Sequence, residues 1–130
     1  MSRRAGRALP IAATLASVIV VVGAAAGVAE AHHAWNEIDT TKSTTLAGTV
    51  RSLKWENPHA SLVLDVVDGS TRADLTVLMS GLARMEARGV HGEMVAVGKR
   101  LTIVGSPARD EPHVVRANRV VSDGAEYVLY

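Results

Sequence analysis

Histidine residues at two places in the chain could supply the ligands of a copper site. His32 and His33 are adjacent, and His59 directly follows Asn57 and Pro58. If the chain is cleaved before His32, its new terminal amine and an imidazole nitrogen belong to one residue, and Cu(II) takes such nitrogen ligands in a tetragonal arrangement. His59 is the candidate third ligand, because Pro58 restricts the backbone that leads to it. The alternative is that His32 and His33 lie on a solvated terminus and bind nothing.

Other side chains could add to these ligands. The chain contains no cysteine, which excludes disulfides, thiolate metal sites and cysteine nucleophiles. Thioethers are soft ligands that suit Cu(I), and further imidazoles suit several metals. Met85 has an alternative role as a core residue of a short helix. The additional candidates are His91, His113, Met79, Met85 and Met94.

The segment Trp55-Glu56-Asn57-Pro58-His59 interrupts a run of strand-forming residues. One interpretation is a ligand loop at the mouth of a barrel, with Trp55, Asn57, Pro58 and His59 as contact residues. The other is a structural corner between strands, in which the Asn57 side chain bonds to backbone and His59 bonds to a loop carbonyl; Asn and Pro are both common in turns. Both remain open from the sequence.

No set of residues has the pattern of a catalytic site. The serines stand in no nucleophile-elbow context, and nothing places two carboxylates in one apolar pocket. We therefore predict that the chain is not an enzyme. Four arginines could receive an anionic ligand, although such residues more often form a solvated face. They are Arg84, Arg88, Arg116 and Arg119.

The first 31 residues have the order of a secretory signal peptide. Arg3, Arg4 and Arg7 precede an uncharged, Ala/Val-rich run over residues 9–29, and Ala29-Glu30-Ala31 is a small-x-small cleavage signal. We expect cleavage after Ala31 and a periplasmic or secreted protein with no stable membrane span. The alternative is an uncleaved anchor, because 21 residues are enough to span a bilayer. The remaining 99 residues carry 11 basic and 12 acidic side chains, a formal charge of −1.

Residues 32–43 are polar without a clear period and are expected to form an N-terminal arm. From residue 44 the pattern is that of short strands, with predicted strands at 44–55, 60–67, 71–78, 101–104, 113–121 and 126–130. Gly48 predicts a bulge or bend, and Asp68-Gly69 and Asp123-Gly124 predict hairpin turns. Ser80 and Gly89 bound a predicted helix of two to three turns.

This order predicts an all-β domain with one short helix over residues 44–130. Three strands, a helix and two further strands match a small OB-like five-stranded antiparallel barrel. An open antiparallel sheet with the helix packed on it is the alternative. A core of this size is small, and burial of apolar side chains must stabilise it without disulfides.

Several segments resemble an exported bacterial family of unknown function, domain of unknown function 6152. The most specific is Trp55-Glu56-Asn57-Pro58-His59, and the others are Leu46-Ala47-Gly48-Thr49-Val50, Gly98, Gly105-Ser106-Pro107-Ala108-Arg109-Asp110 and Ala117-Asn118-Arg119-Val120. The resemblance covers the whole domain and implies a periplasmic OB-like fold with no established activity. Here Ala60 and Ser61 follow His59, where the family tends to carry an aromatic residue.

Together these features predict a small, non-enzymatic binding or accessory domain in the periplasm, with an unknown protein or small ligand as its partner. The alternative function is that of a copper-binding or metal-carrier protein. We expect no nucleic-acid partner, because the charge is near neutral and aromatic stacking residues are scarce. The apolar C-terminal residues 127–130 predict a weak homodimer through an exposed strand edge.

Overall fold

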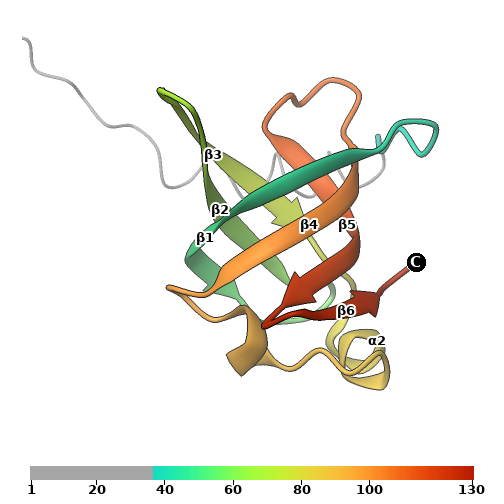
Figure 1. Cartoon of the computed structure of the whole chain (residues 1–130). Coiled ribbons are helices and arrows are strands. Elements are labelled where there is room, and N and C mark those ends of the chain that lie inside the picture. Colours follow the sequence, from blue (N-terminus) through green and yellow to red (C-terminus); the bar gives the residue numbers. More distant parts are fainter. Residues whose placement is uncertain (1–36) are drawn as a thin grey trace, which may run out of the picture.

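The computed structural model describes residues 37–130 (Figure 1). The predicted signal segment and the histidine pair at 32 and 33 lie outside these residues. In chain order the elements are β1 (Thr44–Lys54), β2 (Ser61–Asp68), β3 (Thr71–Leu78), α2 (Leu82–Ala87), the 3₁₀ helix η1 (Gly92–Val95), β4 (Arg100–Pro107), β5 (Val114–Ser122) and β6 (Ala125–Val128).

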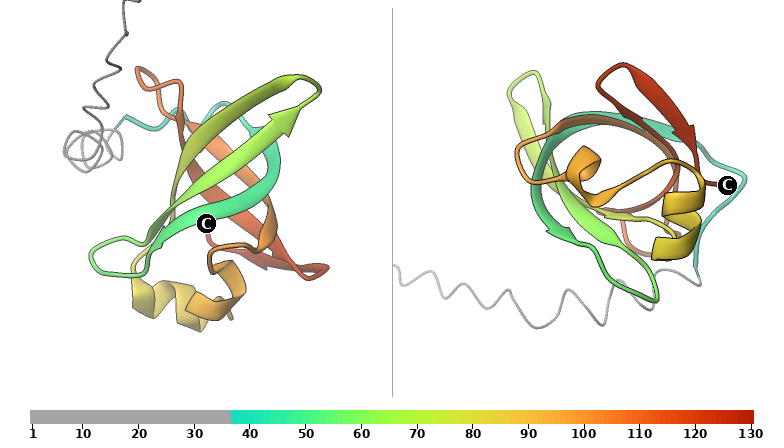
Figure 2. Two further views of the ribbon diagram at one scale, coloured as in Figure 1. Left: turned by 90° about the vertical axis from the view of Figure 1, so that its left-hand side faces the viewer. Right: turned by 90° about the horizontal axis from the view of Figure 1, so that it is seen from below.

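Five strands close into a barrel, which confirms the OB-like prediction and rules out the open sheet. The strand order is β3-β2-β1-β4-β5, and β3 also pairs with β5. The right-hand view of Figure 2 shows the barrel from one end, with the strands arranged as a ring. The closing β3–β5 pair is parallel, so the barrel is mixed and not wholly antiparallel as predicted. A chain segment that contains α2, η1 and β4 separates these two strands, so that β5 can run in the same direction as β3.

Strand β1 contributes to both halves of the barrel, and Gly48 lies where the two halves meet. Residues 44–49 pair with β4 and residues 48–54 pair with β2. A Cβ atom at Gly48 would lie 2.4 Å from the Asp65 carbonyl oxygen, so the close approach of β2 requires glycine. The bend was predicted here; the irregularity in the pairing occurs a few residues later, between Val50 and Ser52.

Both predicted hairpin turns are present, and their backbone angles explain the residues used. Gly69 has a φ of 60° and opens the turn between β2 and β3. Asp123 and Gly124 both have positive φ, 49° and 78°, which is the type I′ pattern that matches the twist of paired strands. These turns fix the registers of β2–β3 and β5–β6.

Helix α2 is shorter than the predicted segment 80–89, and its N-cap is Gly81 instead of Ser80. The Ser80 carbonyl accepts a hydrogen bond from the Ala60 N–H at 3.0 Å, so Ser80 still belongs to the extended chain that pairs with the start of β2. Gly89 follows the helix with a φ of 85°, as predicted. No helix within residues 37–130 is long and apolar enough to cross a membrane.

The core fills the barrel and continues under α2 at one end. Met85 of α2 and Leu129, beyond β6, are both fully buried in it. The predicted arm is described from residue 37 onward. There Ile38 forms a bridge with Ala108, and the Asp39 N–H donates to the Pro107 carbonyl at 2.9 Å. The other fully buried large side chains are those of Val50, Leu64, Val77, Met79, Val90, Val95, Leu101, Ile103 and Val120.

Candidate binding face

A cluster of four charged side chains lies on the outer face of β1, β2 and β3. Asp65 of β2 is directly opposite Asp74 of β3 in the antiparallel register. Two like charges at this position repel each other and destabilise the pair of strands. The arrangement therefore requires positive charge nearby.

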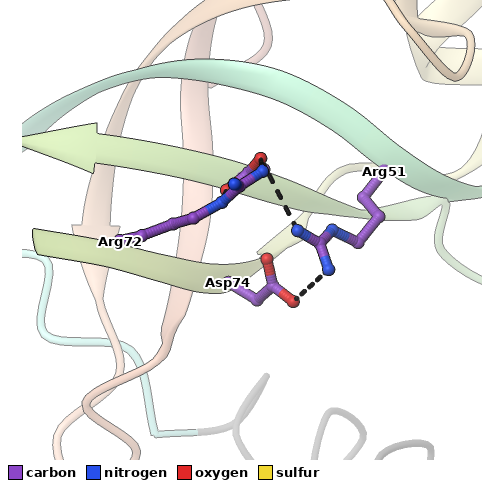
Figure 3. Close-up of polar contacts among 4 residues, drawn as sticks. Arg51, Arg72 and Asp74 are labelled. Carbon is purple, nitrogen blue, oxygen red and sulfur yellow. Dashed lines mark hydrogen bonds and ion pairs between the residues drawn. The ribbon is translucent and has the colours of Figure 1, made fainter.

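Two arginines supply that charge from opposite sides. Arg72 donates to Asp65 through Nε at 2.8 Å and through Nη2, so the contact is bidentate. Arg51 reaches over from β1, with Nη1 3.3 Å from an Asp74 oxygen and Nη2 3.6 Å from an Asp65 oxygen. Figure 3 shows Arg51 pointing toward Asp74, with Arg72 on the other side of the cluster. The four residues thus form one network with no net charge.

Arg51 reaches the cluster because of the irregularity in β1. The register with β2 shifts between Val50 and Ser52, which leaves Arg51 as the extra residue. An extra residue of this kind bends the strand and turns its side chain in a new direction. Val50, immediately before it, remains buried.

The network also changes proton affinities. The hydrogen bond from Arg72, helped by the charges of Arg72 and Arg51, lowers the pKa of Asp65 below its usual value of 3.8. In turn, the hydrogen bond to Asp65 raises the pKa of Arg72. Both partners are therefore held in their charged forms at neutral pH.

These four residues were not among the candidates predicted from the sequence. A signal for two of them was present, because a two-residue turn at Gly69 and Ser70 places Asp65 opposite Asp74 once the register is counted back from the turn. The position of Arg51 depends on the bulge between Val50 and Ser52; Gly48 predicted a bulge or bend in this strand, but a few residues too early to indicate Arg51.

The loop from Trp55 to His59 supports the start of α2. The Asn57 Oδ1 atom accepts a hydrogen bond of 3.0 Å from the Leu82 N–H, so the Asn57 side chain bonds to backbone as the structural interpretation predicted. The Trp55 ring contacts Gly92, at which a Cβ atom would lie 3.5 Å from it. Trp55 also packs against the core, while His59 is half-buried.

The copper site stays a prediction, because His32 and His33 lie outside the described residues. Within residues 37–130 no group of three His, Asp or Glu side chains could hold a metal ion. His59 follows the end of β1, whereas His113 lies beside the opposite end, because Thr44 pairs with Gly105 near the β4–β5 loop.

The three methionines suggested as copper ligands have contacts of other kinds. Met79 and Met85 are fully buried in the core. The Met94 sulfur accepts a hydrogen bond from the His91 N–H at 3.4 Å, which closes the turn of η1. The prediction of Met85 as a core residue is therefore confirmed.

Two of the four suggested arginines come together on one aromatic ring. The guanidinium carbons of Arg84 and Arg116 lie 5.3 Å and 4.6 Å from the Tyr130 ring centroid. Arg119 instead pairs with Glu126 at 3.3 Å, and Arg88 is exposed at the end of α2. Cation–π contacts of this kind hold the last residue against α2 and β5.

Comparison with known proteins gave one family and several similar solved structures. No curated protein matches the sequence. One of these structures is that of Rim1, a mitochondrial single-stranded DNA binding protein from S. cerevisiae. It has a TM-score of 0.49 and 5% sequence identity, and the match covers 63% of this chain and 93% of that chain.

Rim1 is described as a single-stranded DNA binding protein, whereas we expected this chain to have no nucleic-acid partner. That expectation rested on net charge and on the scarcity of aromatic residues; these two features do not exclude nucleic acid, and the expectation is withdrawn. The family model matches residues 19–115, which include part of the predicted signal segment and end within β5. The chain belongs to this family of unknown function, DUF6152.

Proposed function

We propose that the chain is a non-enzymatic binding domain that uses the outer face of β1, β2 and β3 to contact a protein partner outside the cytoplasm. The observation that carries the proposal is the network of Arg51, Asp65, Arg72 and Asp74. It lies on the face that OB barrels commonly use for ligands. The likeness is one between folds and not between sites.

The network fixes its arginines while leaving them accessible. The side chains of Arg51 and Arg72 are 52% and 64% exposed, although both are paired with carboxylates. An arginine has five N–H donors, so each retains donors for a partner. Because the side chains are already held in place, a partner that binds them loses less conformational entropy than it would with free arginines.

The charges of the network favour a partner that carries both signs. Asp74 is 46% exposed beside Arg51, so an approaching surface meets a carboxylate and a guanidinium together. A protein surface with acidic and basic side chains can add to these pairs without breaking them. Such paired charges contribute mainly to specificity and to the rate of association.

The location outside the cytoplasm is proposed from the first 31 residues, which have the order of a signal peptide. N-terminal sequencing of the protein recovered from its native cells tests this part. We expect the mature chain to begin at His32. A chain that still begins at Met1 in the cytoplasm would overturn the proposed location.

The binding face can be tested with a photo-crosslinking amino acid in place of Val67. Val67 is 60% exposed and lies opposite Arg72 in the hairpin. The matched control is the same substitution at Val97, which is 64% exposed in the turn before β4. On illumination of intact cells, we expect a discrete crosslinked protein from position 67 but not from position 97, and its loss when Arg72→Ala is added.

The outcomes separate the proposal from its alternatives. Equal products from both positions, or none from position 67, would overturn the proposed face. Purified protein titrated with a fluorescent single-stranded oligonucleotide provides the second arm. Binding of the oligonucleotide that Arg72→Ala abolishes would retain the face and replace the protein partner with nucleic acid.

A further inference from the structure

Part of strand β3 has a backbone edge with no neighbouring strand among residues 37–130. All of β3 pairs with β2, but β5 pairs only with Thr76, Val77 and Leu78. Residues 71–75 belong to the hairpin that extends past the barrel in Figures 1 and 2. Such an edge can pair with another chain.

The hairpin register shows which backbone groups this edge presents. The two-residue turn closes on Asp68 and Thr71, and in such a hairpin the closing residues bond to each other. Because bonding alternates along a strand, Ala73 also bonds toward β2, whereas Arg72 and Asp74 direct their N–H and C=O groups to the open edge. The Thr76 N–H confirms this alternation, since it donates outward to the His113 carbonyl at 2.8 Å.

We propose that a second copy of this chain pairs with the open edge, antiparallel and around a two-fold axis at Ala73. In this register Arg72 lies opposite Asp74 of the other copy, and Asp74 lies opposite Arg72. Both residues present their backbone groups to the edge, so each opposing pair exchanges two backbone hydrogen bonds. The interface is the same on both copies, as a two-fold axis requires.

The charges of the edge favour a second copy over an unrelated strand. Charged residues usually prevent edge pairing, but here the sequence Arg72-Ala73-Asp74 is complementary to itself when reversed. Two opposite-charge pairs form across the axis, and cross-strand pairs of this kind stabilise a sheet. Arg72 keeps donors free after its contact with Asp65.

The dimer would join the outer faces of the two barrels into one continuous sheet surface. It does not depend on the proposed protein partner, because the edge and its charges are present in the isolated chain. It also differs from the predicted dimer through residues 127–130, so an experiment can distinguish the two.

The first test is disulfide trapping with Ala73→Cys. The two-fold axis places residue 73 opposite itself in a non-hydrogen-bonded pair, where the Cα atoms are about 4.5 Å apart. This spacing suits a disulfide, and the chain has no other cysteine. The matched control is Thr71→Cys, because its two copies would be roughly 13 Å apart along the paired strands. We expect rapid crosslinking at 73 and slow crosslinking at 71.

The second test exchanges charges. Asp74→Arg places arginines opposite each other in the dimer, and Arg72→Asp places aspartates there. Each variant alone should be monomeric in sedimentation velocity, whereas an equimolar mixture should form a heterodimer with both charge pairs restored. Circular dichroism of each variant establishes that it is folded before mixing.

A third variant removes both the outward backbone donor and the carboxylate of residue 74, while leaving the backbone bonds to β2. Asp74→Pro loses the outward N–H on both copies, so the dimer dissociation constant should rise about tenfold or more. A purified native chain that stays monomeric in sedimentation velocity at every concentration tested would overturn the proposal. A dimer that persists unchanged in Asp74→Pro, together with crosslinking of Ala73→Cys no faster than that of Thr71→Cys, would also overturn it. The dimer would then form through another surface.

Discussion

Asn57 links two segments that are 25 residues apart by bonding to the first residue of α2. Its Oδ1 accepts from the Leu82 N–H at 3.0 Å, and the N-cap residue Gly81 has no side chain to do this. The first N–H groups of a helix have no partner within the helix. Asn57 therefore acts as a cap supplied from a distant loop.

Asn57→Ala should lower the stability of the domain. Loss of a capping side chain typically costs about 1 kcal/mol, which corresponds to a fall in Tm of roughly 4–8 °C for a domain of this size. Thermal unfolding followed by circular dichroism measures it. Asn57→Asp keeps the accepting oxygen and is the control. If both variants unfold at the same reduced temperature, the bond to Leu82 is not the cause.

Asp65 should make stability depend on pH in the acidic range. Arg72 and Arg51 lower its pKa in the folded chain below the usual 3.8, so folding favours the ionised carboxylate. The resulting stabilisation is complete above about pH 4, the pKa of an aspartate in the unfolded chain. It is lost as the pH falls through the lower pKa that Asp65 has in the folded chain. The difference in Tm between the native chain and Asp65→Asn should thus be largest near neutral pH and should narrow below about pH 4.

Thermal unfolding between neutral pH and strongly acidic pH provides the test for Asp65. Asp110→Asn, at an exposed position in the β4–β5 loop, serves as the matched control and should not show this pattern. A difference between the native chain and Asp65→Asn that stays constant through the acidic range would contradict the assigned role of Arg72.

Among the elements, β1 depends on a single glycine for its close approach to β2. Gly48 pairs with Val66 on one side and Leu101 on the other. A Cβ atom there would meet the Asp65 carbonyl oxygen at 2.4 Å and the Leu64 Cγ at 2.9 Å. The first contact involves backbone, so it cannot be relieved by moving a side chain alone.

Gly48→Ala should therefore separate β1 from β2 and destabilise the barrel by about 1–3 kcal/mol, the usual cost of overpacking. Urea unfolding measures the change. Gly92→Ala is the control, because its Cβ would meet the Trp55 ring at an ordinary distance of 3.5 Å. A Gly48→Ala variant as stable as Gly92→Ala would show that β1 has room to shift.

Elements marked by local residue chemistry could be predicted from the sequence, and the others could not. Asp68-Gly69 and Asp123-Gly124 identified both hairpins because these turns need positive φ. The helix η1 has no comparable signal; it ends in Val95, which is buried, and the Ser122 hydroxyl bonds to the Met94 carbonyl from a distant strand. Its formation depends on tertiary contacts.

The candidate site shows the same division. A bond from the Asn57 side chain to backbone could be predicted, because Asn in a turn commonly makes one, but its partner Leu82, 25 residues away, could not. The contact of Arg84 and Arg116 with Tyr130 could not be predicted, since it requires the positions of α2, β5 and the last residue together. Closure through a parallel β3–β5 pair is likewise a property of the whole chain.

At the scale of the whole molecule, the barrel and the C-terminal residues share one core. Leu129 lies beyond β6, yet it is fully buried among the residues of the main cluster. Its N–H donates to the Asn118 carbonyl at 2.8 Å, which holds the last residues against β5. Part of the backbone of residues 127–130, predicted as an exposed edge, is therefore already bonded within the domain.

Leu129→Ala should destabilise the entire barrel and not only its C-terminal strand. Truncation of a fully buried leucine costs about 2–5 kcal/mol, while Val128→Ala, at a side chain that is 47% exposed, should change stability little. Because one core joins all the strands, unfolding in urea should remain a single transition for both variants, with coincident circular dichroism and fluorescence curves. A separate early transition in Leu129→Ala would show that the C-terminal residues unfold independently of the barrel.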